Sequence, residues 1–295
     1  MEGNKSREWL EKYYSPSRWN KRMGADKVVQ HYLKVCGECS EETKQSLNVE
    51  LNVPYGEGKA KMDLFYPPLN DHDSAPVIVF IHGGYWQQGS KDLYSFVSNS
   101  WTKAGCIAVV LGYNLAPEAS VEQIITEIQA ALEHIVVKFP KSKLFLCGHS
   151  AGAHLSAMMA LANWNKGGLV SQAVHGMFLL SGIFDLVPLV NTSNNDALKL
   201  DADSAAKISP LTILKEVSPT ICCPTLVVVE EHGSPEFIRQ SKEFDEILKS
   251  HGVQSSFLWL SGVDHFNLIE NMADPEDQLC KEILKVVLKD RKSVV

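Results

Sequence analysis

The sequence lacks the features that mark several classes of protein. Its 295 residues carry 28 Lys and Arg against 35 Asp and Glu, a net charge of −7, and no sustained basic run. Proteins that bind the phosphate backbone of nucleic acids usually carry a basic patch, so we do not expect a nucleic-acid partner. The longest apolar runs, such as Val77–Ile81 and residues 106–111, have the length of a strand and are too short to span a membrane.

Cysteine is present, but not in a pattern typical of metal sites or disulfide frameworks. The seven cysteines are an odd number and are scattered along the chain. Cys36 and Cys39 form one C-x-x-C, and Cys222 and Cys223 are adjacent, but no second ligand pair accompanies them. The first fourteen residues are charged and lack the apolar core of a secretory signal. We therefore expect free thiols, no metal site and a cytosolic protein, with access to the nucleus left open.

No repeat or low-complexity linker divides the chain, and we expect one domain over residues 1–295. Residues 1–40 are aromatic and helical in pattern. Residues 47–53 and 60–66 alternate apolar and polar side chains around a Pro-Tyr-Gly-Glu-Gly turn, which predicts an antiparallel hairpin with one buried face. Residues 185–222 are the least regular part and are expected to form a short cap.

After Pro76, strand-like runs alternate with helical patterns. The apolar positions between Val121 and Phe139 recur at helical spacing. The strand-like runs are Val77–Ile81 and residues 106–111, 144–147, 177–180, 225–229 and 257–260. This alternation predicts an α/β fold with a mostly parallel, doubly wound sheet and the hairpin at its edge. In such sheets ligands bind at the carboxyl ends of the strands, so we expect the chemistry there.

A G-x-S-x-G pattern follows the strand at residues 144–147. It runs Gly148-His149-Ser150-Ala151-Gly152 and precedes a predicted helix. A sharp turn between a strand and a helix lifts a serine hydroxyl clear of the sheet, and it needs glycines where a side chain would collide with its neighbours. The helix N-terminus adds positive potential at the same place. Ser150 is therefore the candidate nucleophile.

A second motif, His82-Gly83-Gly84-Tyr85-Trp86, follows the strand Val77–Ile81. Consecutive glycines let backbone N–H groups point into a cavity, as an oxyanion hole requires. Gly83, Gly84 and the N–H of Ala151 are the expected donors. Trp86 could form a wall of the substrate pocket. The aromatic residues of the N-terminal segment are more simply explained by packing than by substrate binding; they are Trp9, Tyr14 and Trp19.

The expected general base is His265. It follows the last predicted strand and lies downstream of the serine, in Gly262-Val263-Asp264-His265-Phe266. A histidine in this position can take the proton of Ser150 and later deliver it to the leaving group. We expect His149, inside the turn, and His154, on the following helix, to be structural.

Together these motifs resemble the arylformamidase (kynurenine formamidase) family of α/β-hydrolases. The similar segments span nearly the whole chain in order: Tyr14-Ser15-Pro16-Ser17-Arg18-Trp19, HGGYW at 82–86, GHSAGAH at 148–154, SGIFDL at 181–186, SPEF at 234–237 and VDHF at 263–266. The resemblance implies hydrolysis of the aryl formamide N-formylkynurenine without metal or organic cofactor, with Ser150 as nucleophile, His265 as base and HGGYW as oxyanion segment. It also suggests a homodimer. A general short-acyl carboxylesterase, or a nearly inactive relative that binds a metabolite or protein, are the alternatives.

The chain departs from the family pattern at the third member of the triad. The family has E-H-D-S-P-E-F where this chain has Glu231-His232-Gly233-Ser234-Pro235-Glu236-Phe237, so Gly233 stands where the catalytic Asp is expected. Loss of that acid typically lowers kcat about 10⁴-fold. Either no residue replaces it, or a carboxylate from elsewhere does; the candidates are Glu230, Glu231, Asp185 and Asp264. On this basis Gly233→Asp is expected to raise turnover.

Overall fold

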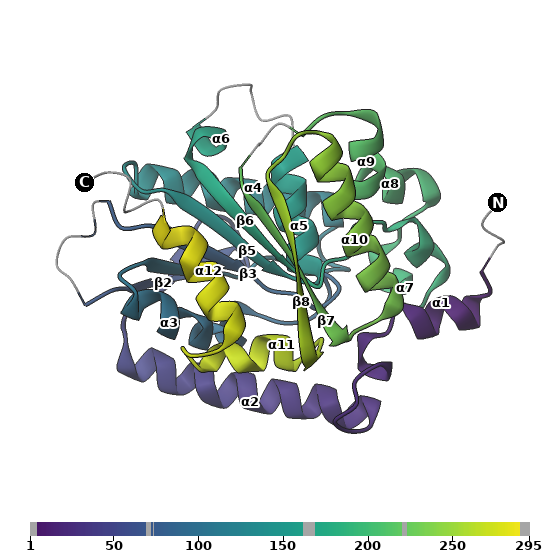
Figure 1. Ribbon diagram of the computed structural model, residues 1–295, viewed down its shortest axis with the longest axis horizontal. Helices are drawn as coiled ribbons and strands as arrows, with labels where there is room; N and C mark the ends of the chain where they lie inside the picture. Colours follow the sequence, from purple (N-terminus) through teal and green to yellow (C-terminus); the bar gives the residue numbers. More distant parts are fainter. Residues whose placement is uncertain (1–4, 69–71, 73, 162–168, 220–222, 290–295) are drawn as a thin grey trace.

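A sheet of eight strands forms the centre of the molecule (Figure 1). The computed structural model describes residues 5–68, 72, 74–161, 169–219 and 223–289. In this part of the chain the strand order is β1-β2-β4-β3-β5-β6-β7-β8. The strands are β1 Asn48–Pro54, β2 Lys61–Tyr66, β3 Val77–Ile81, β4 Ile107–Leu111, β5 Leu144–His149, β6 Val174–Leu180, β7 Thr225–His232 and β8 Ser255–Asp264.

The predicted edge hairpin is present, and its predicted apolar face is buried or partly buried except at Leu51. β1 and β2 pair antiparallel, and β2 continues antiparallel to β4. The register of β1 shifts between Glu50 and Val53, where Asn52 has a φ of 59° and donates its N–H to the Asp63 carboxylate at 2.7 Å. This bulge breaks the alternation, and Leu51 is 45% exposed. The expectation of one buried face along residues 47–53 therefore fails at Leu51, while Leu47, Val49 and Val53 are partly buried as predicted.

From β3 onward the sheet is parallel, as predicted. β3 pairs with β4 and β5, and β6, β7 and β8 follow in sequence order. All residues of β3, β4 and β5 are buried, because helices cover both faces of the sheet. β7 and β8 extend further than the apolar runs predicted, to His232 and Asp264.

Helices cover the two faces of the sheet (Figure 1). A hydrophobic core lies between the sheet and the helices on each face. Side chains of α4, α5 and α10 contribute to one core, and those of α2, α3 and α12 contribute to the other. The helices are α1 Arg7–Tyr13, α2 Ala25–Ser46, α3 Ser98–Lys103, α4 Val121–Lys138, α5 Ala151–Leu161, α6 Leu169–Ala173, α7 Asn195–Leu198, α8 Ala202–Lys207, α9 Pro210–Glu216, α10 Pro235–Ser250, α11 Asn267–Glu270 and α12 Gln278–Lys289.

Two irregular parts complete the fold. The N-terminal segment consists of α1, a 3₁₀ turn at Pro16–Arg18 and the long helix α2, which runs beneath the sheet in Figure 1. The segment where a cap was expected contains a 3₁₀ turn at Val187–Asn191 followed by the short helices α7, α8 and α9. Residues 220–222, which include Cys222, lie outside the described residues.

Helix α5 approaches the sheet so closely at Gly152 that no side chain fits at this position. All eleven of its residues are buried. A Cβ on Gly152 would lie 2.7 Å from the carbonyl oxygen of His82 and closer still to that of Ile81. Backbone atoms at that distance cannot give way as a flexible side chain would, so only glycine fits where α5 crosses the end of β3.

We predict that Gly152→Ala lowers the free energy of unfolding by about 3 kcal/mol or more, because the methyl group has no space. Gly37→Ala in α2 is the matched control. Its added Cβ would meet only Leu93, at 3.9 Å, and the better helix propensity of alanine should stabilise the protein by up to about 1 kcal/mol. Urea denaturation of both variants measures the difference. Equal stability of the two variants would contradict the packing argument.

Candidate active site

Ser150 lies at a strained turn between β5 and α5. Its φ is 55°, a left-handed conformation that residues with a side chain rarely adopt. The backbone N–H of Ser150 donates to the carbonyl of Leu180 at 2.8 Å, which ties the turn to β6. A Cβ on Gly148 would lie 2.5 Å from the Ser156 hydroxyl oxygen and closer still to the carbonyl of Gly152. The glycines flanking Ser150 thus make the turn possible, and its hydroxyl lines a cavity.

The HGGYW segment lies directly against this turn. A Cβ on Gly83 would lie 2.9 Å from the Cβ of Ser150, so the backbone of the segment touches the serine. Gly84, Tyr85 and Trp86 all have positive φ, with values of 109°, 52° and 59°. Ala151 is the first residue of α5, where the N–H has no acceptor within the helix. The expected oxyanion donors are therefore brought together beside Ser150.

His82 anchors this segment from the core. Its ring stacks on Tyr113 with centroids 4.3 Å apart, and its Nδ1 lies 2.7 Å from the carbonyl oxygen of Gly83. Burial lowers the pKa of His82 to about 4, so the ring is neutral at physiological pH. His82 therefore acts as a packed structural residue.

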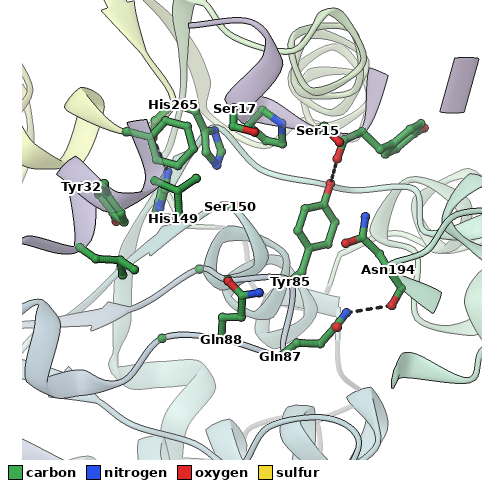
Figure 2. A pocket seen from close by; sticks show the side chains of 18 of the residues that line it. Ser15, Ser17, Tyr32, Tyr85, Gln87, Gln88, His149, Ser150, Asn194 and His265 are labelled. Carbon is green, nitrogen blue, oxygen red and sulfur yellow. Dashed lines mark hydrogen bonds between the residues drawn. The ribbon is translucent and has the colours of Figure 1, made fainter. Parts of the chain in front are cut away.

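We expected Trp86 to form a wall of the pocket, but it does not line the cavity. Its ring is fully buried and packs edge-on against His154, with centroids 4.9 Å apart. The consecutive positive φ values turn the chain here, so that Tyr85, not Trp86, lines the cavity. The hydroxyl of Tyr85 donates to the backbone carbonyl of Tyr14 (Figure 2).

His265 faces a buried carboxylate and a hydroxyl. Its Nδ1 lies 3.2 Å from Oε1 of Glu230 and 2.9 Å from Oγ of Ser181. The Ser181 hydroxyl donates to the same Glu230 oxygen at 2.7 Å. Ser181 follows β6 and has a φ of 47°; sequence reasoning missed it, although it opens the SGIFDL segment. Nε2 of His265 is left as the nitrogen that can serve Ser150.

The other acid candidates turn away from His265. Glu231 accepts the backbone N–H of Gly262 at 2.7 Å, and Asp185 accepts that of Val187 at 3.0 Å. Asp264 pairs with Arg22 at 2.6 Å. Gly233 carries no side chain. Among the four candidates, the structure places Glu230 at the imidazole.

His149 and His154 have the structural surroundings expected of them. Nε2 of His149 lies 3.1 Å from the carbonyl of His265, and Nε2 of His154 lies 2.7 Å from that of Ile208. Burial lowers the pKa of both rings, that of His154 to about 4. Both imidazoles are therefore neutral. His149 also borders the cavity and supports the His265 loop from below.

The cavity that joins these groups has a volume of about 240 Å³ (Figure 2). Its described lining contains tyrosines, hydroxyls and amides but no Lys, Arg, Asp or Glu. The lining residues are Tyr14, Ser15, Pro16, Ser17, Val29, Tyr32, Leu33, Gly83, Gly84, Tyr85, Gln87, Gln88, Gly89, Tyr94, His149, Ser150, Asn194, His265 and Phe266. The cavity is thus polar, and its described lining contains no Lys, Arg, Asp or Glu side chain to attract a charged group.

The N-terminal segment forms one wall of this cavity. Tyr14 is buried there and accepts a hydrogen bond from the side chain of Gln240 at 2.9 Å. Trp9 and Trp19 are absent from the lining; both pack on Tyr13, with centroids 4.0 Å and 5.1 Å away. The packing explanation thus describes the two tryptophans, whereas Tyr14 also contributes to the cavity.

The described residues contain no group of three or more His, Cys, Asp or Glu side chains placed to hold a metal ion. Cys36 of the C-x-x-C is buried in α2, and burial raises the pKa of its thiol. In the same described ranges, every helix is too short or too polar to cross a bilayer.

An ion cluster fastens the N-terminal segment to the His265 loop. Arg22 binds Asp264 at 2.6 Å and Glu270 at 2.8 Å, and both carboxylates are buried. Burial by itself would raise the pKa of Asp264. Hydrogen bonds from Arg22 and from the N–H groups of Phe266 and Asn267 outweigh it, and the pKa lies below its usual value.

We predict that Arg22→Met destabilises the protein by about 2–4 kcal/mol at pH 7, because two buried carboxylates lose their partner. Since the folded-state pKa of Asp264 is lowered, its stabilisation is present above pH about 4 and is lost as the pH falls through that pKa. The difference in Tm between wild type and variant should therefore narrow from pH 7 to pH 3.5. Arg7→Met, which removes an exposed pair with Glu11, is the control. A difference that is constant with pH would contradict the assignment.

The chain is similar to known proteins along nearly its whole length. The BD-FAE family model matches residues 62–242. A kynurenine formamidase from Danio rerio is 36% identical over 287 residues, which cover 96% of this chain and 97% of the relative.

Among solved structures, a Silicibacter protein has a TM-score of 0.81 at 28% identity and covers 94% of this chain and 98% of that one. A hyperthermophilic esterase from Pyrobaculum calidifontis has a TM-score of 0.68 at 18% identity, with coverage of 92% and 95%, and shows the fold alone. The chain belongs to the kynurenine formamidase family and has the α/β-hydrolase fold.

Proposed function

We propose that this chain is a serine hydrolase that cleaves aryl formamides, with N-formyl-L-kynurenine as substrate and L-kynurenine and formate as products. One observation carries the proposal: Ser150, His265 and the Gly83–Gly84 backbone border the same cavity. The relatives named kynurenine formamidase support the formamide substrate. In the proposed reaction neither a metal nor an organic cofactor takes part.

The first half of the reaction releases the amine. His265 takes the hydroxyl proton of Ser150 as the oxygen attacks the formyl carbon. The N–H groups of Gly83, Gly84 and Ala151 stabilise the oxyanion that forms, because these residues lie beside Ser150. The carbon–nitrogen bond then breaks, and the proton held by His265 passes to the aryl amine, which leaves as kynurenine.

The second half releases the acid. A water molecule gives one proton to His265 and attacks the formyl ester on Ser150. The same donors stabilise the second oxyanion. Formic acid departs as the bond to the serine oxygen breaks, and the proton returns from His265 to that oxygen; the released acid then loses its proton to water and becomes formate. The enzyme is regenerated, and one water has been consumed for each bond hydrolysed.

The remaining groups of the cavity suit an aromatic substrate with neutral polar substituents. Tyr14, Tyr32 and Tyr85 supply ring faces, and the amides of Gln87 and Gln88 supply donors and acceptors. Gln87 is held in place by a bond to the carbonyl of Asn194 at 2.8 Å. We propose that the amino and carboxylate groups of kynurenine, which sum to zero charge, are bound by such hydrogen bonds.

The proposed setting is the cytosol, with a possible nuclear pool, and a homodimer is the proposed assembly. Cys36, Cys39, Cys147 and Cys280 are free thiols in the described part of the chain, which supports a reducing compartment. The proposed partner is a small molecule rather than a nucleic acid or a membrane.

Replacement of the nucleophile tests the proposal. We predict that Ser150→Ala lowers kcat for N-formylkynurenine by at least about 10⁴-fold, because attack on the formyl carbon is lost. Ser250→Ala, at an exposed serine that only bonds to Ile247, should keep wild-type activity. Kynurenine formation followed over time measures both. Turnover of short acyl esters but not of the formamide would instead favour a general esterase, and the absence of any turnover or organophosphate labelling would favour a binding protein.

The absence of Lys, Arg, Asp and Glu from the described cavity lining allows a second test, which asks how the cavity binds the carboxylate of the substrate. We predict that the carboxamide of N-formylkynurenine has a KM within about tenfold of that of the acid, because no cationic side chain lines the described cavity to favour the carboxylate. Gln88→Arg should lower KM for the acid while leaving KM for the carboxamide unchanged or higher. A strong preference of the wild-type protein for the acid would contradict recognition by neutral groups.

A further inference from the structure

We propose that Glu230 takes over the role of the triad acid by positioning His265, and that Gly233 is the residue that makes this possible. Under this proposal, the space between positions 230 and 233 accommodates one carboxylate, which can come from either position but not from both. The proposal rests on the proposed function in one respect, that His265 is the base for Ser150.

The geometry at Nδ1 of His265 is that of a triad acid. Oε1 of Glu230 lies 3.2 Å from this nitrogen, and the shared Ser181 hydroxyl bridges the two at 2.9 Å and 2.7 Å. A carboxylate at this atom holds the imidazole in the tautomer that leaves Nε2 free to accept a proton. Glu230 belongs to β7, which pairs along its length with β8, the strand that leads into His265.

Glu230 lies in an environment that is energetically unfavourable for a carboxylate. Its side chain is fully buried, and its second oxygen, Oε2, has no hydrogen-bond partner among the described residues. A buried carboxylate without full hydrogen bonding is costly. The imidazolium that forms during catalysis would supply the missing positive charge, which makes this burial useful to the reaction.

Gly233 is required by space and not by backbone conformation. It is not among the glycines with positive φ, so other residues could adopt its backbone angles. A Cβ on Gly233 would lie 2.7 Å from Cδ of Glu230, 2.9 Å from Cγ and closer still to Oε1. The Glu230 carboxylate therefore fills the space in which a side chain at position 233 would begin.

The two positions therefore exclude each other. A carboxylate at 233 can reach this space only if the residue at 230 vacates it, and Glu230 fits only if 233 is glycine. The sequence alone led us to expect that Gly233→Asp raises turnover. The proposal predicts the opposite, because the substitution crowds two acids into one buried space. The family pattern and this chain would be two solutions to the same requirement.

A double-mutant cycle tests the proposal. The variants are Glu230→Gln, Glu230→Gly, Gly233→Asp and the double variant Glu230→Gly/Gly233→Asp. We expect Glu230→Gln to lower kcat for N-formylkynurenine about 10²- to 10⁴-fold with KM changed less than about threefold, because the charge at His265 is lost and the pocket is not. Gly233→Asp alone should lower kcat, and the double variant should exceed each of its single variants at least about tenfold.

The matched control is Glu231→Gln. Glu231 is the neighbouring carboxylate, exposed and bonded to the Gly262 N–H, and its loss should leave kcat unchanged. Wild-type kcat in Glu230→Gln would overturn the proposal. So would a double variant no faster than Glu230→Gly, since the two positions would then not share a role.

The rate at which a fluorophosphonate labels Ser150 keeps this test separate from the substrate. Labelling needs an activated serine but no formamide, so it should follow the same order across the variants. A wild-type protein that is labelled but does not hydrolyse N-formylkynurenine would refute the proposed function, while the labelling rates would still decide the role of Glu230. Equal labelling of wild type and of folded Glu230→Gln, as judged by circular dichroism, would refute that role.

Discussion

The close contact between α5 and the end of β3 is the constraint on which the candidate site depends. Gly152 brings the helix against the carbonyls of Ile81 and His82, and this contact leaves Ser150 in a left-handed conformation above the sheet. The same contact sets the Gly83 backbone against the serine. The proposed nucleophile and the proposed oxyanion donors thus share one packing interaction, so their relative position is fixed by the packing of α5 on the sheet.

The rest of the site is assembled from distant parts of the chain around this fixed centre. Arg22 binds Asp264, 242 residues away in sequence, and so holds the N-terminal segment to the neighbouring His265. The same segment brings Tyr14 to the cavity, where it meets Tyr85 of the oxyanion segment. The cavity wall that contains Tyr14 and the loop of His265, the proposed general base, are therefore connected through one ion cluster.

The sequence was sufficient for the parallel sheet, the Ser150 turn and the position of His265, because each depends on local patterns: apolar runs, glycine spacing and a residue after the last strand. It was insufficient where the direction of a side chain determines whether the residue is buried, exposed or in the cavity. The bulge at Asn52 exposed Leu51, and positive φ values turned Trp86 into the core. No pattern of apolar residues shows such local reversals of the chain, because they depend on backbone angles set by tertiary contacts.

The sequence also could not show which of the four candidate acids lies beside His265, because this too depends on the direction of a side chain. The apolar run predicts that β7 ends at Val229, whereas the strand continues to His232, and Glu230 points from its end toward His265. A catalytic triad requires a carboxylate oxygen within hydrogen-bond distance of Nδ1 of the histidine, and it does not require that this oxygen come from a particular sequence position. A longer side chain from within the strand can satisfy it as well as a shorter one from the loop, provided that the loop residue leaves room. A glycine at the expected acid position therefore argues for a displaced acid as readily as for a lost activity.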